Sequence, residues 1–354
     1  MLFRRLSSIL TVLVAATTAG AAPTPEQQVK AVAQKLMDLN PGFDGKVTSE
    51  IRDGSVSEFG LVTDDVTDIS PLSELKGLKS LVCAGSGNQT GRLVDLSPLK
   101  DLRLTYLDCG GNRVSDLSPL RNMRLEVLYC YRSGVADLSP LKDMKLTQLT
   151  CYGAQISDLS PLKDMKLSSL NCVGTLISDL TPLKDMKLET LDCTATRVSD
   201  LSPLRDMRPT HINCAFSPVS DLSPLQDMKL IGLYCQHTKV SDLAPLKNMK
   251  LEEFYCGGTL VADLSPLKDM QLTVLLCEDT RVSDLTPLKG MPLSGLNCRG
   301  TRVTDLSPLK GMPLKNLGCD FKPDRDSAIL RSLNTLKQIN DKPVKEFWRE
   351  VEAR

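Results

Sequence analysis

Cysteine is the residue whose chemistry and spacing are most informative in this chain. Twelve cysteines occur among 354 residues, and the eleven from Cys109 to Cys319 recur at every twenty-first position. Thiols in proteins form disulfides, bind metal ions or act as nucleophiles. A period this regular indicates a stacked structural repeat, in which each of these cysteines has the same environment.

Stacking of the repeats argues against disulfides and metal sites. Equivalent residues in adjacent parallel strands lie about 4.8 Å apart with parallel side chains, whereas a disulfide needs β-carbons about 3.8 Å apart and turned toward each other. We therefore expect free thiols, buried as small hydrophobic residues. Because the chain has two histidines and no CxxC pair, we predict no metal site and no cofactor.

The two histidines offer no arrangement for nucleophilic catalysis. His211 lies three residues before Cys214 and is expected on the outward strand face, while His237 lies in the turn after Cys235. A catalytic nucleophile has to be held against such a base. Since the thiols are expected to point inward and the imidazoles outward, we predict that the chain is not an enzyme and has no catalytic residues.

A column of aspartates precedes each Leu-Ser-Pro or equivalent segment. Its members are Asp95, Asp116, Asp137, Asp158, Asp179, Asp200, Asp221, Asp242, Asp263, Asp284 and Asp305. Aspartate side chains commonly accept N–H groups of their own turn, and we expect that role here. Calcium bound between stacked carboxylates is the alternative, which the absence of Gly-rich metal-loop spacing disfavours.

The repeat contains two elements that would position these residues. In the unit that begins at Leu146, the apolar residues Leu149 and Cys151 are two positions apart. This spacing predicts a short strand with both side chains on its inward face. Apolar residues then recur every third position, as in a 3₁₀ helix; they are Ile156, Leu159, Leu162 and Met165. We expect Ser160 to cap this return and Pro161 to preset its φ.

The pattern L-x-x-L-x-C-x-x-(T/S/N/A)-x-(V/I)-x-D-L-(S/T/A)-P-L resembles the leucine-rich repeat, with Cys in place of the last Leu of the strand. The D-(L/I)-S-P-L return is similar to that of internalins and related bacterial surface proteins. The resemblance covers about residues 56–319. It implies an α/β solenoid of about 13 coils, a leucine-rich-repeat rod with a parallel β-sheet on one face and short 3₁₀ or irregular returns on the other. Because the returns are slim, we expect weak curvature.

The resemblance also implies a hydrogen-bonding column three residues after each cysteine. In the family, Asn side chains at this position bond the backbone of the next coil. Here the position holds Asn112, Ser133, Ala154, Thr175, Thr196, Ser217, Thr238, Thr259, Thr280 and Thr301. Hydroxyls can replace part of that ladder with fewer bonds, and Ala154 is expected to leave one weaker or hydrated rung.

The ends of the chain differ from the repeats. Residues 1–22 have a basic start, a short apolar run and small residues, which predict a secretory signal. Residues 23–55 predict an N-terminal cap of a helix and a hairpin, and residues 320–354 a helical C-terminal cap. The mature chain is therefore expected to be secreted or held in the periplasm or cell envelope, without membrane insertion after cleavage.

Tyrosine is the residue type that suggests a binding surface. All six tyrosines lie three before, one before or one after a repeat cysteine, at positions expected to face outward: Tyr106, Tyr129, Tyr131, Tyr152, Tyr234 and Tyr255. Tyrosine is favoured in contact surfaces, although strands favour aromatic residues in any case. Asp108, Asn171 and Asp192 are expected on the same face and add polar groups.

These observations predict an exported, non-enzymatic recognition protein. Its strand face would bind a protein or peptide partner through two tyrosine patches, one from Tyr106 to Tyr152 and one from Tyr234 to Tyr255. A glycan or cell-wall binding module and a structural envelope spacer without a ligand are the alternatives. Nucleic acid is not an expected partner, because Lys+Arg and Asp+Glu both number 43.

Overall fold

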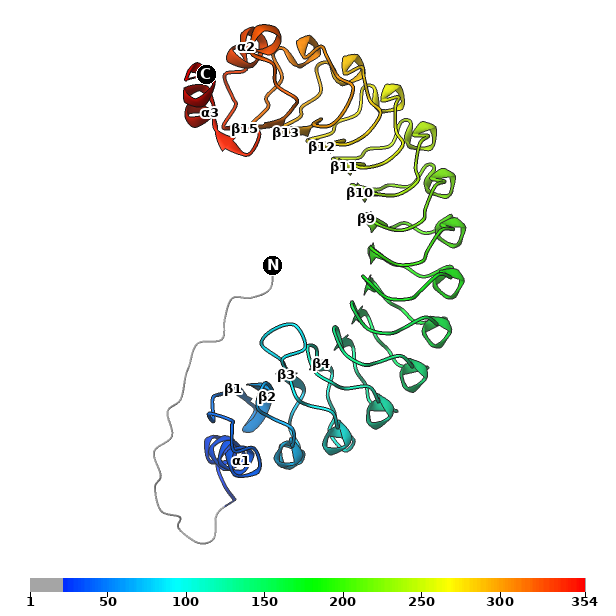
Figure 1. Cartoon of the computed structure of the whole chain (residues 1–354). Coiled ribbons are helices and arrows are strands. Elements are labelled where there is room, and N and C mark those ends of the chain that lie inside the picture. The colour runs from blue at the N-terminus through cyan, green and yellow to red at the C-terminus, as the bar shows by residue number, and fades with distance from the viewer. Residues whose placement is uncertain (1–21, 354) are drawn as a thin grey trace. The chain divides into compact units, whose positions relative to one another are not determined.

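The computed structural model describes residues 22–353, so the predicted signal segment lies outside the described residues except for its last position. The chain divides into two compact units, 1–176 and 177–354, here called unit 1 and unit 2. Each is a solenoid of short strands and 3₁₀ returns (Figure 1). The predicted combination of parallel strands and 3₁₀ returns is confirmed in both units.

Unit 1 begins with helix α1 (Pro25–Leu39), which covers the first coil. A capping box holds its start: Gln27 N–H donates to Thr24 Oγ1, and Thr24 N–H donates to Gln27 Oε1. At its end, the Asn40 amide donates to the carbonyls of Leu36 and Asp68, both at 2.8 Å. Asn40 therefore ties the helix to the turn of the first coil.

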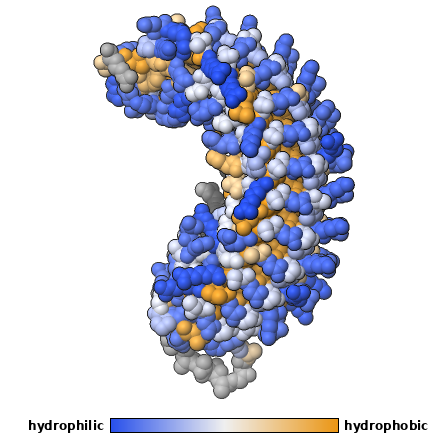
Figure 2. Space-filling model, turned by 45° about the vertical axis from the view of Figure 1, so that its right-hand side comes forward, coloured by the Kyte–Doolittle hydropathy of each residue, from blue (hydrophilic) through white to orange (hydrophobic). Residues whose placement is uncertain are grey.

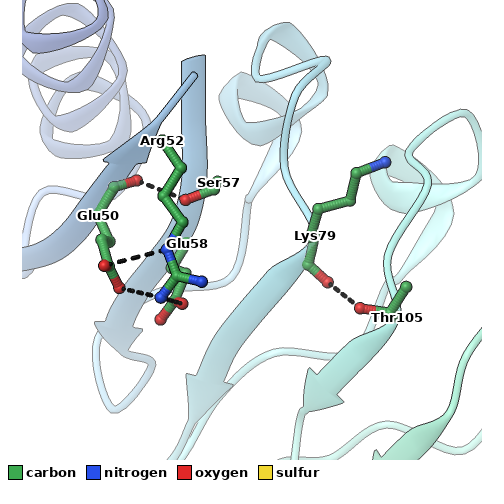
Figure 3. Close-up of polar contacts among 6 residues, drawn as sticks. All are labelled: Glu50, Arg52, Ser57, Glu58, Lys79 and Thr105. Carbon is green, nitrogen blue, oxygen red and sulfur yellow. Dashed lines mark hydrogen bonds and ion pairs between the residues drawn. The ribbon is translucent and has the colours of Figure 1, made fainter. Parts of the chain in front are cut away.

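An antiparallel hairpin follows, formed by β1 (Val47–Arg52) and β2 (Ser55–Val62). Its turn holds Asp53 and Gly54, both with positive φ. Arg52 reaches between Glu50 and Glu58 on the exposed face, with Nη2–O distances of 2.9 and 3.1 Å (Figure 3). Such exposed pairs contribute little to stability. The hairpin joins the solenoid because β2 pairs in parallel with the next strand, with Leu61 opposite Cys83.

The remaining strands of unit 1 follow in sequence order and pair in parallel. They are β3 (Ser80–Ala84), β4 (Tyr106–Asp108), β5 (Val127–Tyr129), β6 (Gln148–Thr150) and β7 (Ser169–Asn171). Threonines also link neighbouring coils, as where Thr105 Oγ1 donates to the Lys79 carbonyl (Figure 3). A loop follows β3, and Asp64 accepts hydrogen bonds from Ser86 and Thr90 of this loop.

Unit 2 continues the same pattern with parallel neighbours. Its strands are β8 (Thr190–Asp192), β9 (His211–Asn213), β10 (Gly232–Tyr234), β11 (Glu253–Tyr255), β12 (Val274–Leu276), β13 (Gly295–Asn297) and β14 (Asn316–Gly318). Rows of hydrophilic side chains cover much of the visible surface, with apolar side chains in a narrow band between them (Figure 2).

A C-terminal cap closes unit 2. It consists of α2 (Pro323–Ser332), the short strands β15 (Gln338–Ile339) and β16 (Lys342–Pro343), and α3 (Val344–Glu352). The cap was predicted to be helical throughout, and its β15–β16 hairpin was not predicted. Trp348 packs edge-on against Phe321 and Phe347, with Arg331 over its ring at 3.9 Å.

Aspartate, and not serine, caps the 3₁₀ returns. In the coil of Asp158, the Ser160 N–H donates to Asp158 Oδ1 and the Ser160 hydroxyl donates to Oδ2, at 2.7 and 2.6 Å. The expected serine cap was wrong because the carboxylate accepts both protons. These bonds hold the pKa of the Asp158 carboxyl below its usual value. The local role expected for the aspartate column is thus confirmed in this coil.

The hydroxyl column differs from the ladder that the resemblance implied. From Ser133 to Thr301, each hydroxyl donates to the cysteine carbonyl three residues earlier in its own coil, at 2.5–2.7 Å. Only Asn112 is long enough to bond the preceding coil as well, through the Cys83 carbonyl at 2.7 Å. At Ala154 the backbone N–H donates to the Cys151 carbonyl at 3.2 Å, so this rung keeps a donor.

All twelve cysteines are buried and free, as predicted. Each repeat cysteine follows directly after its regular strand, and its N–H commonly continues the ladder; Cys130 N–H, for example, donates to Thr150 O at 2.9 Å. Burial raises the pKa of the Cys130 thiol to about 12. The thiolate, which is the reactive form, is therefore scarce at neutral pH.

We expect the folded protein to resist thiol reagents. Ellman's reagent should detect almost no thiol in the native protein and close to twelve per chain after unfolding without a reductant, because burial blocks both access and ionisation. The same titration after reduction serves as the control. A large increase on reduction would reveal disulfides and contradict the free-thiol column.

The described residues contain neither a metal-binding cluster nor a helix that could span a membrane. Residues 22–353 contain no group of three or more His, Cys, Asp or Glu side chains placed to hold a metal ion. Within that range, no helix has the length and apolar character needed to cross a bilayer.

Candidate functional site

Four tyrosines gather on the strand face of unit 1, here called the unit 1 tyrosine surface: Tyr106, Tyr129, Tyr131 and Tyr152. Tyr106 and Tyr129 meet edge to face, with ring centroids 5.6 Å apart, and Tyr131 and Tyr152 stack at 4.8 Å with planes 6° apart. The rings are half-buried against one another, so the expectation that they simply face solvent was incomplete. The mutual packing fixes the orientation of each ring before any partner arrives.

A glycine creates the space for the stacked pair. A β-carbon on Gly110 would lie 2.4 Å from the Tyr131 ring, so the ring rests on bare backbone. Its other face meets Tyr152. Arg132 stands over Tyr152 at 5.2 Å, which adds a cation–π contact. Tyr131 and Tyr152 project from positions just after β5 and β6 and not from within them.

Asp108 and Asn171 have local roles on this face. Asp108 Oδ1 accepts the Gly110 N–H at 3.0 Å, and Asn171 Oδ1 accepts the Val173 N–H at 3.3 Å. Burial raises the pKa of Asp108. Burial and the nearby Asp108 carboxylate raise the pKa of Tyr131 to about 12. Tyr131 therefore keeps its hydroxyl proton at neutral pH and can donate to a partner.

Tyr234 and Tyr255 form a second cluster, the unit 2 tyrosine surface. Their rings meet edge to face at 4.8 Å. The Tyr234 hydroxyl donates to Glu253 Oε2 at 2.6 Å. Burial, together with this hydrogen bond, raises the pKa of Tyr234. A β-carbon on Gly232 would lie 2.7 Å from the His211 ring and 2.8 Å from the Tyr234 hydroxyl, so this glycine also makes room for aromatic rings.

Asp192 does not join the tyrosines of unit 2. It lies in β8, two strands before β10, and its Oδ1 accepts both the N–H and the hydroxyl of Thr194, at 3.1 and 2.6 Å. Its carboxylate stabilises the turn after the strand, as Asp108 does in unit 1.

Sequence reasoning missed an aromatic pair beside the unit 2 tyrosine surface. Phe216 and His237 stack with ring centroids 4.5 Å apart, and Phe216 is 58% exposed. Both have positive φ, at 56° and 54°, in a column where several coils have glycine. An aromatic residue two positions after Cys214 and another after Cys235 was the available signal.

Neither histidine is placed as a general base. His211 Nδ1 lies 2.9 Å from Thr210 Oγ1, whose own proton is directed to the Glu189 carbonyl at 3.0 Å. With its proton directed to the Glu189 carbonyl, this hydroxyl is not held as a nucleophile against the imidazole. His237 stacks on Phe216. This geometry offers no nucleophile–base pair at either imidazole.

Two depressions of the described chain lie away from the tyrosines. One, of about 520 Å³, lies in the C-terminal cap beside Phe321, Asn340 and Phe347. Another, of about 310 Å³, lies beside α1 near Leu39 and Pro71. No tyrosine lines either depression. The tyrosine surfaces are suited to a broad contact, whereas small ligands are usually enclosed.

Comparison with known proteins identifies the fold. No protein-family model matches the chain, and no curated protein matches it. Among solved structures, an internalin (InlF) from Listeria monocytogenes is 23% identical, with a TM-score of 0.72 over 91% of this chain and 99% of that one. The functional domain of InlJ from the same species, which includes a cysteine ladder, is 22% identical, with a TM-score of 0.52 over 88% of this chain and 77% of that one.

A plant protein shows the same likeness. The leucine-rich-repeat ectodomain of the receptor kinase GASSHO1/SCHENGEN3 from Arabidopsis thaliana, in complex with CASPARIAN STRIP INTEGRITY FACTOR 2, is 16% identical, with a TM-score of 0.60 over 83% of this chain and 39% of that one. At such identities the likeness defines the fold and not the ligand. The chain therefore has the leucine-rich-repeat fold, with 21-residue coils and a buried cysteine after each regular strand of the repeat run.

Proposed function

We propose that the chain is an exported, non-enzymatic recognition protein that binds a protein or peptide on its strand faces. The observation that carries this proposal is the placement of all six tyrosines on those faces, in contacting pairs. Rigid, amphipathic rings supply contact area at a low cost in conformational entropy. The basic and apolar start of the sequence supports export.

The packing of the rings favours a protein over a glycan. Sugar rings stack on free aromatic faces, yet Tyr131 has Gly110 beneath one face and Tyr152 on the other. Its hydroxyl and ring edge remain for a partner. The plant ectodomain of the same fold was solved in complex with CASPARIAN STRIP INTEGRITY FACTOR 2, which also supports this choice.

Substitution of the unit 1 tyrosines should abolish partner retention. The triple variant Tyr129→Ala, Tyr131→Ala, Tyr152→Ala is expected to keep its circular dichroism and to lose at least about tenfold in affinity, because it removes three aromatic anchors. The measurement is capture from an envelope extract, identification by mass spectrometry, and titration of the purified partner. Arg121→Ala with Lys142→Ala, on exposed return positions, is the control.

Two further arms define the class of ligand. Gly110→Ala keeps all six tyrosines in the sequence, but its β-carbon would displace the Tyr131 ring, so this variant should also bind the partner more weakly. Retention that survives protease treatment of the extract would point to a glycan instead. Equal retention by the wild type and the triple variant would refute the assignment of the surface.

A further inference from the structure

The strand face of unit 2 has unbalanced negative charge. Face positions lie three before, one before, one after and two after each cysteine. From Thr190 to Asp279 these positions hold four carboxylates and no lysine or arginine: Asp192, Glu253, Glu278 and Asp279. The next cation, Arg299, already pairs with Asp341 at 2.9 Å. Charge complementarity therefore favours a cationic partner.

Two buried acceptors on this face lack donors. Among residues 22–353, Gln236 Oε1 and Glu278 Oε2 are the buried side-chain polar atoms without a hydrogen-bond partner. Both residues come directly after a cysteine. The Glu278 side chain lies over Gly257, where a β-carbon built on that glycine would be 2.6 Å from Glu278 Cδ. A buried acceptor without a donor is costly. Both side chains are only part-buried, so a rotation would bring the oxygens to a donor from outside.

Aromatic rings flank these acceptors in sequence and on neighbouring strands. Tyr255 precedes Cys256, between the coils of Gln236 and Glu278, and contacts Tyr234. Phe216 is exposed. It also has a left-handed backbone conformation, which disfavours side chains larger than glycine. Arginine matches this combination, because its planar guanidinium stacks on rings and donates up to five hydrogen bonds.

We propose that the unit 2 strand face binds an arginine-bearing segment of the partner. Guanidinium groups donate to the carboxylates of Glu253 and Glu278 and to the amide oxygen of Gln236, and their planes lie against Tyr255 and Phe216. The assignment rests on the proposed function, since it specifies the chemistry of the partner at one of its two surfaces.

Peptide binding tests the charge requirement directly. Fluorescent hexaarginine should bind the purified protein at least about tenfold more tightly than hexacitrulline, which has the same shape without charge. Its affinity should fall as salt rises from about 0.05 to 0.3 M. Glu253→Gln with Glu278→Gln, which keeps side-chain size, should lose about tenfold in affinity for hexaarginine while thermal stability stays near that of the wild type.

A matched control separates the site from general charge. Asp206→Asn with Asp269→Asn makes the same charge change at exposed return positions of unit 2 and should leave hexaarginine affinity unchanged. Equal binding of hexacitrulline, or equal loss in the control, would overturn the assignment. If the Gln variant is unstable, the hexacitrulline and salt measurements on the wild type still decide.

Failure here is distinguishable from failure of the proposed function. If the purified partner is retained through the unit 1 tyrosines but binds the Glu253→Gln, Glu278→Gln variant normally, only the arginine site is wrong. If no protein is retained at all, recognition of a protein partner is wrong, and the peptide result stands as a measurement of the acidic face alone.

Discussion

Replacement of Phe254 by alanine is expected to lower the free energy of unfolding by about 3–5 kcal/mol. Phe254 occupies the centre of β11 and is fully buried. The neighbouring strands carry Leu233 and Leu275 at the same register. The alanine variant therefore leaves a cavity that adjacent coils, fixed by their own backbone bonds, cannot fill.

Two controls isolate the cavity. Phe254→Leu introduces the residue of the neighbouring strands and should cost about 1 kcal/mol. Phe216→Ala removes an equally large ring from an exposed position and should change stability little. Urea unfolding should be followed together with hydrogen exchange, because repeat arrays can lose two-state behaviour. Equal losses in the free energy of unfolding for Phe254→Ala and Phe216→Ala would contradict the burial of Phe254 in β11.

Removal of residues 320–354 is expected to make most of the expressed protein insoluble. The cap completes the last coil: Asn340 Oδ1 accepts the Cys319 N–H, and the Asn340 amide donates to the Cys319 carbonyl. Ile339 pairs with Leu317 and is itself fully buried. Without these contacts, β14 becomes an open edge next to exposed apolar side chains, and uncapped solenoid ends aggregate.

Deletion of one internal repeat is the matched control for the cap. A chain without residues 236–256 loses a full period of 21 residues but keeps both ends and joins equivalent positions. It should remain soluble and monomeric by light scattering, since stability in such arrays depends on adjacent repeats. Solubility of the truncated chain, or insolubility of the internal deletion, would contradict the capping role.

The strict period explains why the fold could be predicted. One residue type at one interval defined the register of the eleven coils from Cys109 to Cys319, and the third-position apolar residues predicted the 3₁₀ returns. The cap hairpin was missed because strands of two residues, such as Gln338–Ile339, have no periodic pattern. The serine cap was wrong because Asp158 and Ser160 both present oxygen near one turn, and only geometry decides which accepts.

The site was less predictable than the fold. Alternation placed the tyrosines on the strand face, but the stacking of Tyr131 on Gly110 depends on a glycine one coil away. The unpartnered oxygens of Gln236 and Glu278 depend on how each side chain leans between coils. Such leaning is set by neighbours 21 residues away, which a reading of one repeat does not include.

The hydrogen bonds from the hydroxyl column to the cysteine carbonyls of the same coils have a consequence for how the repeat number can evolve. From Ser133 to Thr301 these bonds close within single coils, so a copied coil carries its own internal donors and acceptors. A tandem duplication in the gene can therefore lengthen the protein by one coil without orphaning these groups. Natural variants whose lengths differ by whole periods are the expected outcome. Each added coil would bring further outward-facing residues that mutations can change.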